Sequence, residues 1–181
     1  MPFNNQPTLV GPRLVLRPLG DGDKQALRLA ASDPATWEQH PARERHRPEV
    51  FDAYFDFLMR AGGTLATMEG GRIIGCSRYY TVPDQPDDIG IGFTFLAPTH
   101  WGGRYNLDMK RLMVDHAFAY FERIWFHIAP DNLRSQVATT RLGATWQYDA
   151  ELDLGTGPAL QKCYRMTPES WAAAISDRSA E

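Results

Sequence analysis

The sequence predicts a single α/β domain in which helices cover a mixed β-sheet, and three observations lead to this fold class. The chain has 181 residues, which is close to the usual size of one domain and enough to bury one core. Hydrophobic residues make up 43% of the chain and charged residues 23%, as in ordinary globular proteins. Segments with the two-residue period of a strand alternate with segments of helical spacing, in the order β-α-α-β-β-β-α-β-α-β-β.

The first third of the chain predicts one strand and two helices. Residues 13–19 alternate apolar and polar side chains, which indicates a strand, and the aspartates that follow offer caps for a helix to about residue 32. Residues 37–47 are polar and basic and indicate a loop or a short helix. Pro48 suits the first turn of a second helix, in which apolar side chains recur at i, i+3, i+4 and i+7 until Gly62.

The middle of the chain is rich in strands. Residues 64–68 and 72–82 flank a Glu-Gly-Gly turn, which predicts a hairpin. Residues 83–86 indicate a loop, and residues 88–97 indicate the next strand, which contains two glycines. Glycine inside a strand often marks a bulge or a close approach of another group to the backbone.

The last 80 or so residues predict helices and strands in alternation. The predicted elements are, in order, a helix at 105–121, a strand at 124–129, a helix at 131–142 with Gly143 at its C′ position, strands at 145–153 and 159–166, and a helical turn from Pro168.

Composition excludes several functional classes. The net charge of −3 and the pI of about 5.9 argue against nucleic-acid binding that depends on phosphate neutralisation. We expect no membrane span, because no run of about 18 apolar residues occurs, and no secretory signal in residues 1–7. Cys76 and Cys163 form no metal-ligand spacing, so we expect no metal site and two reduced thiols in a cytoplasmic protein.

Residues 95–110 have the properties of an anion site. A strand leads through Gly102 and Gly103 into an amphipathic helix, and the free N–H groups at a helix N-terminus attract negative charge. The glycines allow a phosphate to approach the backbone, and Arg104 adds a charged donor. On the glycines alone, a plain strand-to-helix turn is the alternative interpretation.

These residues resemble the pyrophosphate-binding segment of GNAT N-acetyltransferases, and in particular the RimJ/RimL-like branch that acetylates the N-termini of ribosomal proteins. Residues 91–96 (IGFTFL) match the strand of that branch, and Trp101, Gly102 and Tyr105 match its loop. Arg104 stands where the branch usually has glycine, and Asn106 where it has alanine or glycine. Both departures are compatible with an anion, since one adds positive charge and the other a polar donor.

The resemblance covers most of the chain, with a core of about residues 9–172. Residues 9–19 resemble the opening strand of the family, and residues 71–75 (GRIIG) its central hairpin. Asn132 and Ser135, followed by Leu142-Gly143, resemble its N-x-x-S…L-G segment. Residues 164–171 resemble its closing strand.

The resemblance implies the GNAT fold, a mixed and mostly antiparallel sheet whose two central parallel strands splay apart. Here these strands would be 88–97 and 124–129, and the pantetheine arm of acetyl-CoA would lie between them. The residues expected to bind this cofactor are Phe95, Leu96, Trp101, Gly102, Gly103, Arg104, Tyr105, Asn106, Asn132 and Ser135. A plain N-cap is the alternative role for Asn132, and a solvent-facing position the alternative for Ser135.

The proton-transfer groups are ambiguous in the sequence. Many relatives have Glu where this chain has Gly90, and Tyr where it has Thr139. Asp88 lies on the same strand face two residues before Gly90 and is a candidate base, with a structural carboxylate at the loop end as the alternative. His127, in the strand beside the expected gap, is a second candidate, with a structural histidine as the alternative.

The expected acceptor site lies on the hairpin strand and in the preceding loop. Ser77, Arg78 and Tyr79 are expected to face the acceptor, and Trp37 lies in the loop region that lines acceptor sites in the family, together with His40. The resemblance implies direct transfer of an acetyl group from acetyl-CoA to a primary amine, either a protein N-terminus or a small molecule. A non-catalytic acyl-CoA-binding domain is the alternative, and a homodimer is compatible with either.

Overall fold

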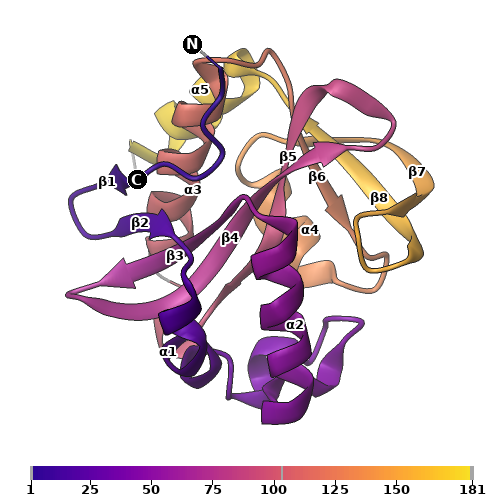
Figure 1. The fold of residues 1–181 in the computed structure, drawn as a ribbon. Helices are drawn as coiled ribbons and strands as arrows, with labels where there is room; N and C mark the ends of the chain where they lie inside the picture. The colour runs from indigo at the N-terminus through magenta and orange to yellow at the C-terminus, as the bar shows by residue number, and fades with distance from the viewer. Residues whose placement is uncertain (1, 103, 180–181) are drawn as a thin grey trace.

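One eight-stranded mixed sheet organises the chain, with the strand order β1-β2-β3-β4-β5-β6-β8-β7 (Figure 1). The computed structural model describes residues 2–102 and 104–179. Neighbouring strands are antiparallel except for β5 and β6, which are parallel. The strands are β1 (Leu9–Val10), β2 (Val15–Pro18), β3 (Thr64–Glu69), β4 (Arg72–Val82), β5 (Gln85–Leu96), β6 (Ile124–Ile128), β7 (Thr145–Asp153) and β8 (Pro158–Met166).

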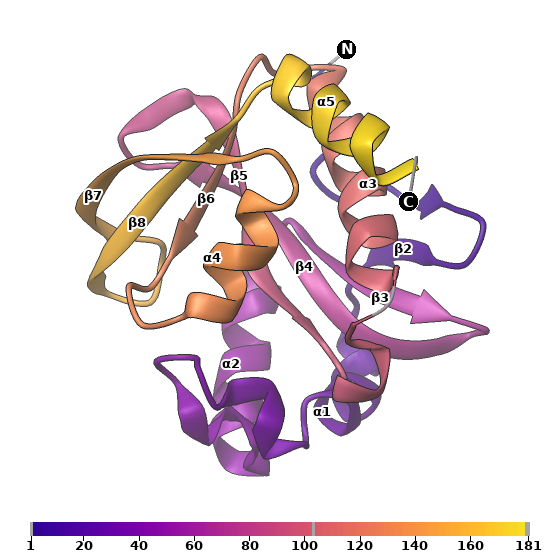
Figure 2. The same ribbon diagram turned by 180° about the vertical axis from the view of Figure 1, so that it is seen from behind.

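Helices cover both faces of this sheet. The α-helices are α1 (Lys24–Ala30), α2 (Pro48–Ala61), α3 (Tyr105–Phe118), α4 (Leu133–Thr140) and α5 (Pro168–Ser179). Helix α2 lies in front of the sheet in Figure 1, and α3, α4 and α5 come to the front when the molecule is turned in Figure 2. The predicted stripe on α2 is confirmed, since Phe51, Tyr54, Phe55 and Leu58 are all buried.

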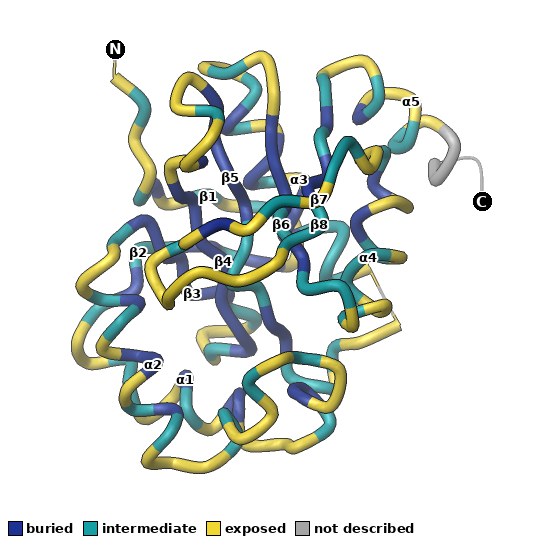
Figure 3. Tube along the Cα trace, turned by 90° about the vertical axis from the view of Figure 1, so that its right-hand side faces the viewer, coloured by how far each residue is buried: buried dark blue, intermediate teal, exposed yellow. Residues whose placement is uncertain are grey.

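The core has one large cluster on each face of the sheet. One cluster joins α3 to the strands through side chains such as Met109, Met113 and Ile124. The other cluster joins α1 and α2 to the strands through side chains such as Leu27 and Phe51. Figure 3 shows the central strands mostly buried and the β7–β8 hairpin largely exposed. The sheet is therefore held from both sides, which fixes the strands whose ends form the site.

A β-bulge interrupts the pairing of β4 with β5. Cys76 pairs with Phe95 but Arg78 pairs with Gly92, so β5 has one more residue than β4 in this interval. Phe93 lies in the bulge with φ of 51°, and it is the non-glycine residue with positive φ in the described part of the chain. The bulge re-aims the backbone of β5 at the point where the strand leaves its parallel neighbour.

Strands β5 and β6 separate soon after they meet. In the described strands they pair at Ile89 with Ile124 and at Gly90 with Trp125, after which β5 runs on to Leu96 and β6 to Ile128 (Figure 2). The strand separation expected from the family resemblance is thus present. Backbone N–H and C=O groups that face such a gap need partners other than the neighbouring strand.

Most predicted elements are confirmed, and the differences lie at their ends. The loop predicted at residues 83–86 is shorter in the structure, because residues 83–84 form a tight turn, Val82 pairs with Gln85, and β5 begins there. The opening segment contains two short strands instead of one. Helix α3 ends at Phe118, three residues before the predicted end, and α5 extends well beyond one turn. Gly143 follows α4 with φ of 91°, which confirms it as a C-terminal glycine.

Candidate functional site

The separation of β5 from β6 opens a cleft of about 1020 Å³. Its walls come from β5 and β6, from the start and first turns of α3, from α4, and from the 3-10 helices Pro34–Trp37 and Arg43–His46 that precede α2. The tip of the β7–β8 hairpin closes one side. Of the residues expected to bind the cofactor, the cleft is lined by Phe95, Leu96, Trp101, Gly102, Asn106, Asn132 and Ser135. Segments that are far apart in the sequence therefore meet in one cavity.

The loop before α3 presents open backbone to this cleft. Gly102 has φ of 70°, and a β-carbon there would meet no other atom within 4 Å, so the space around it is free for a ligand. The Trp101 indole donates to the Leu96 carbonyl at 2.8 Å, which occupies one of the two strand carbonyls expected to face the cofactor. Gly103 lies outside the described residues.

Two loop residues expected at the cofactor do not line the cleft. Arg104 is the N-cap residue of α3, and its side chain is exposed. The Tyr105 hydroxyl donates to the Glu69 carboxylate at 2.6 Å, and its ring packs against His100. Tyr105 therefore ties the loop to the β3–β4 hairpin, and Arg104 lies exposed at the positive end of the helix.

The opposite wall is the start of α4. Asn132 is its N-cap, and its side-chain oxygen accepts from the Ser135 backbone N–H at 3.2 Å. The N-cap role is thus present, and it leaves the amide N–H₂ group of Asn132 available to the cleft. The Arg134 guanidinium lies 4.1 Å from the centre of the Trp101 ring and donates to the Thr36 carbonyl at 2.8 Å. These contacts connect α4 to the α3 loop and to the segment before α2.

A tyrosine–histidine pair lies where β5 and β6 part. Tyr80 on β4 is opposite Gly90, and a β-carbon on Gly90 would lie 2.4 Å from the Tyr80 ring. Gly92 leaves similar room, at 3.0 Å from the same ring. The glycines predicted to mark a close approach therefore accommodate Tyr80, whose hydroxyl meets Nδ1 of His127 at 2.8 Å.

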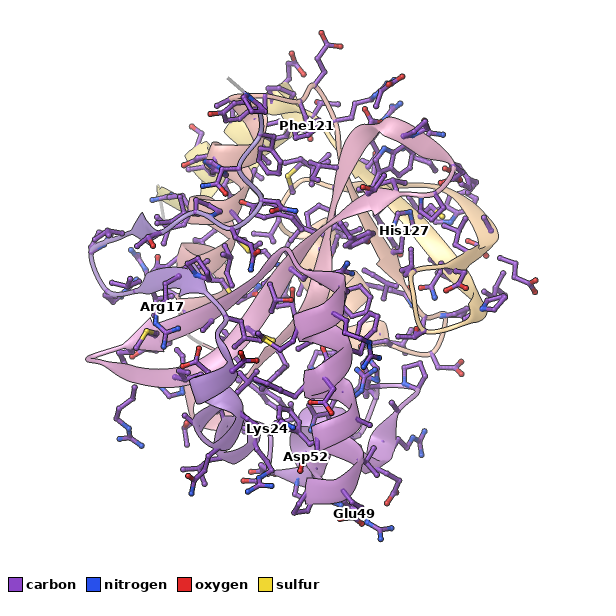
Figure 4. The ribbon with its side chains drawn as sticks, viewed as in Figure 1. Arg17, Lys24, Glu49, Asp52, Phe121 and His127 are labelled. Carbon is purple, nitrogen blue, oxygen red and sulfur yellow. The ribbon has the colours of Figure 1, made fainter. Side chains whose placement is uncertain are left out.

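His127 combines a fixed orientation with a free nitrogen. It lines the cleft from β6, and its Nε2 atom is buried without a hydrogen-bond partner in the described part of the chain. Burial lowers the pKa of His127 to about 4, so the imidazole is neutral at pH 7. Figure 4 shows it in the interior, beside the diverging strands. A buried orphan nitrogen is costly unless a ligand uses it.

Lys110 is a functional candidate that the sequence analysis missed. It lines the cleft from α3, is 5% exposed, and its Nζ lies 2.8 Å from Thr94 Oγ1 and 3.3 Å from Ser77 Oγ. Burial lowers its pKa to about 7. The signal was in the sequence, because a lysine stands between Leu107 and Val114 at i+3 and i+7 of one apolar helix face.

Asp88 lies outside the cleft lining. Its carboxylate, 4% exposed, accepts from Arg123 Nε at 3.0 Å and from the Trp125 indole at 2.7 Å. The structure therefore places it as a paired carboxylate at the closed end of the strand pair, outside the cleft lining and bonded to the Trp125 ring that stacks on His127. This is the structural role that the sequence left open for it.

Three of the residues expected at the acceptor also lie outside the cleft lining, because each is engaged with the core. Ser77 is buried beneath the bulge beside Thr94 and Lys110. Arg78 donates to the Ala61 and Gly62 carbonyls and so caps the C-terminus of α2. The Tyr79 hydroxyl donates to the Met113 carbonyl at 2.7 Å, on the α3 side of the sheet.

The fourth acceptor residue, Trp37, does line the cleft. Its ring lies 5.1 Å from Phe95 and 5.5 Å from His40, and its indole donates to the Ala31 carbonyl. The neighbouring Arg45, which the sequence analysis did not single out, lies over the Tyr54 ring at 3.8 Å. Trp37 therefore belongs to an aromatic and basic wall beside the bulge of β5.

The described residues contain neither a metal-ligand cluster nor a membrane-spanning helix. No group of three or more His, Cys, Asp or Glu side chains is placed to hold a metal ion in the described part of the chain. None of the described helices is long and apolar enough to cross a membrane.

The lowered pKa of Lys110 predicts a pH-dependent stability. Below pH 7 the Lys110 amine is protonated in both the folded and the unfolded chain, whereas between pH 7 and 10.5 it is protonated mainly in the unfolded chain. The free energy of unfolding therefore rises with pH across this range. From pH 7 to 9, the free energy of unfolding of the wild type should rise by about 2 kcal/mol relative to Lys110→Met. Urea unfolding at several pH values measures this.

The matched control is Lys162→Met, on the β7–β8 hairpin, whose stability should follow the wild type across the same range. Parallel pH profiles for the wild type and Lys110→Met would show that the lysine is not buried as described.

Comparison with known proteins agrees with this fold. The model of the acetyltransferase (GNAT) domain family matches residues 13–145. A GCN5-related N-acetyltransferase from Brucella melitensis has a similar structure, with a TM-score of 0.81 and 14% identity over 99% of this chain and 86% of that chain. Mycobacterium smegmatis RimJ in complex with CoA-disulfide gives a TM-score of 0.69 and 18% identity, over 97% of this chain and 96% of that chain.

A third similar structure is the aminoglycoside acetyltransferase AAC(6')-Ib in complex with coenzyme A and kanamycin. Its TM-score is 0.64 and its identity 18%, over 88% of this chain and 98% of that chain. Among curated proteins, none matches the sequence significantly. Because the family model covers well over half of the chain, the protein belongs to the GNAT acetyltransferase family and is an acetyl-CoA-dependent acetyltransferase.

Proposed function

We propose that this protein transfers the acetyl group of acetyl-CoA to a primary amine by direct attack of the amine on the thioester. One observation carries the proposal: a single cleft joins the open N-terminus of α3 to the unpartnered Nε2 atom of His127. The first feature suits a phosphate group, and the second suits proton transfer. Both lie along strands whose backbone groups have lost their pairing partner.

The cleft residues fit the donor, whose thioester supplies an activated acetyl group. The backbone around Gly102, with Arg104 beside it, would hold the pyrophosphate. Asn106, in the first turn of α3, adds a polar side chain to the cleft lining. The separated edge of β5 would bond the amides of the pantetheine arm, together with the free amide N–H₂ of Asn132. Ser135 lies on the same wall of the cleft.

His127 would take the proton from the attacking amine. The neutral ring accepts at Nε2 when Nδ1 carries the proton and donates to Tyr80, so Tyr80 is a positioning residue that selects the tautomer. The new N–C bond forms as the C–S bond breaks, and the amine proton moves to Nε2 directly or through water. His127 thus performs in this chain what the glutamate does in relatives that have it in place of Gly90.

Lys110 would stabilise the negative charge that develops at the reacting carbonyl and at the departing sulfur. Its amine lies under the bulge of β5, held by the hydroxyls of Thr94 and Ser77. With a pKa of about 7, it is partly protonated at neutral pH and can return a proton to the thiolate. Thr139, where many relatives have the tyrosine acid, lines the cleft but has no acidic group to offer.

Reversing the charge of Arg104 tests the donor site. Arg104→Glu places a carboxylate at the N-terminus of α3, where it repels phosphate, and we expect the Kd of acetyl-CoA in calorimetry to rise at least about tenfold. Arg111→Glu makes the same charge change at an exposed position further along α3 and should leave the Kd within about twofold. Equal losses in the two variants would contradict a phosphate site at this loop.

Removing the proposed base tests the mechanism. His127→Gln should lower kcat/KM about 100-fold for any amine that the wild type acetylates, with the Kd of acetyl-CoA unchanged, because only proton transfer is lost. Tyr80→Phe should lower kcat/KM less, since the imidazole of His127 remains and only the hydrogen bond that selects its tautomer is lost. Release of coenzyme A is the readout. A His127→Gln enzyme with wild-type kcat/KM would assign the base elsewhere.

A further inference from the structure

The cleft is positively charged. Its cationic side chains are Arg45, Lys110, Arg134 and Arg141, and no Asp or Glu lines it in the described part of the chain. An acceptor with several positive charges would be repelled by such a surface, because specific binding requires complementary potentials. Part of this charge suits the phosphates of the donor, and a cation that the donor does not use favours an acceptor that carries a negative group as well as its amine.

Among the described residues, two cations of this cleft have no bonded carbonyl, hydroxyl or carboxylate, Arg45 and the exposed Arg141, and the one held by aromatic rings is Arg45. Its guanidinium lies 3.8 Å from the centre of the Tyr54 ring and 5.4 Å from that of Trp37, and it makes no ion pair with a described residue. The neighbouring Arg47, by contrast, is paired with two glutamates. Stacking on aromatic rings fixes the planar guanidinium and leaves its edge available for a bidentate contact.

His40 adds a second donor beside Arg45. Its Nδ1 accepts from the Ala42 backbone N–H at 2.9 Å, so in the neutral ring the proton is on Nε2. Burial, followed by the charges of Arg45 and Arg134, lowers the pKa of His40 to about 3, and the ring is therefore neutral. Nε2 lies 3.3 Å from Nη1 of Arg45. With the proton on Nε2, this contact brings two N–H donors together without an acceptor, and an anionic oxygen beside them would accept from both.

This pair of donors lies near the bulge of β5. The Tyr54 hydroxyl, under Arg45, donates to the Phe93 carbonyl in the bulge of β5 at 3.4 Å. The Trp37 ring, which Arg45 and His40 both contact, lies against Phe95 on the same strand. An anion bound here would lie a few bonds from an amine placed beside the bulge.

We infer that Arg45 and His40 form a subsite for a carboxylate of the acceptor, so that the acceptor is an amino acid or a similar small amine that bears a carboxylate. The inference rests on the proposed function, since it places the acceptor amine at the bulge. Arg134 does not compete for this role, because its guanidinium is bonded to the Ala35 and Thr36 carbonyls. Loss of the carboxylate from the acceptor would leave two converging donors without an acceptor.

An NMR titration with product-like probes tests the subsite without turnover. N-acetylglycine carries the carboxylate, and N-acetylglycinamide is its uncharged match. Each is added to ¹⁵N-labelled protein, free and saturated with coenzyme A. We expect N-acetylglycine to shift the ring N–H signal of His40 and the Nε–H signal of Arg45 in both states, and the amide to shift neither. No shift, or equal shifts with the two probes, would overturn the inference.

Two matched variants separate the subsite from general charge. Arg45→Gln should weaken N-acetylglycine binding at least about tenfold, whereas Arg43→Gln, an exposed position of the same 3-10 helix, should not change it. In kinetics, amino acids should exceed their amides in kcat/KM for the wild type and lose this preference in Arg45→Gln. Equal effects of the two variants would overturn the assignment.

Coenzyme A distinguishes the two proposals from each other. If it abolishes the shifts produced by N-acetylglycine, Arg45 belongs to the donor site and the acceptor subsite is wrong. If coenzyme A fails to bind in calorimetry, the proposed function fails, while the titration of the free protein still reports on the anion subsite by itself.

Discussion

The site depends on one constraint, which is that β5 and β6 pair at only two positions in the described strands before they separate. Parallel strands normally satisfy each other's backbone groups along their length. Here the bulge at Phe93 turns β5 away, and the facing edges are left to other partners. The cleft, the approach to the N-terminus of α3 and the exposure of His127 to a ligand all follow from this separation.

Much of the fold could be predicted because apolar periodicity, and glycine or proline at the ends of elements, determine secondary structure locally. Alternation, apolar stripes and terminal glycines placed almost every strand and helix, and errors were confined to ends such as the start of β5. The anion loop was also predictable, since glycines before a helix let an anion approach the free backbone N–H groups at the helix N-terminus. The family resemblance supplied the strand separation, which no local pattern in residues 88–97 would show.

The side-chain chemistry was less predictable, because it depends on which strands and helices face each other. Gly90 indicated a close approach, but only the register of β4 identifies Tyr80 as the approaching ring. Asp88 and Arg78 were plausible by strand position, yet tertiary partners occupy both. Lys110 required knowing that its helix face lies under the bulge. These contacts join residues that are far apart in the sequence, so they can be identified only in the folded chain.

Hydrogen exchange measures the central constraint directly. If the separated strand edges are completed by acetyl-CoA, its addition should slow amide exchange in residues 91–96 of β5, where this strand has separated from β6. Residues 145–148 of β7, which do not line the cleft, should exchange at an unchanged rate. Unchanged exchange in residues 91–96 at saturating acetyl-CoA would contradict the account, because the open backbone would then serve some purpose other than holding the donor.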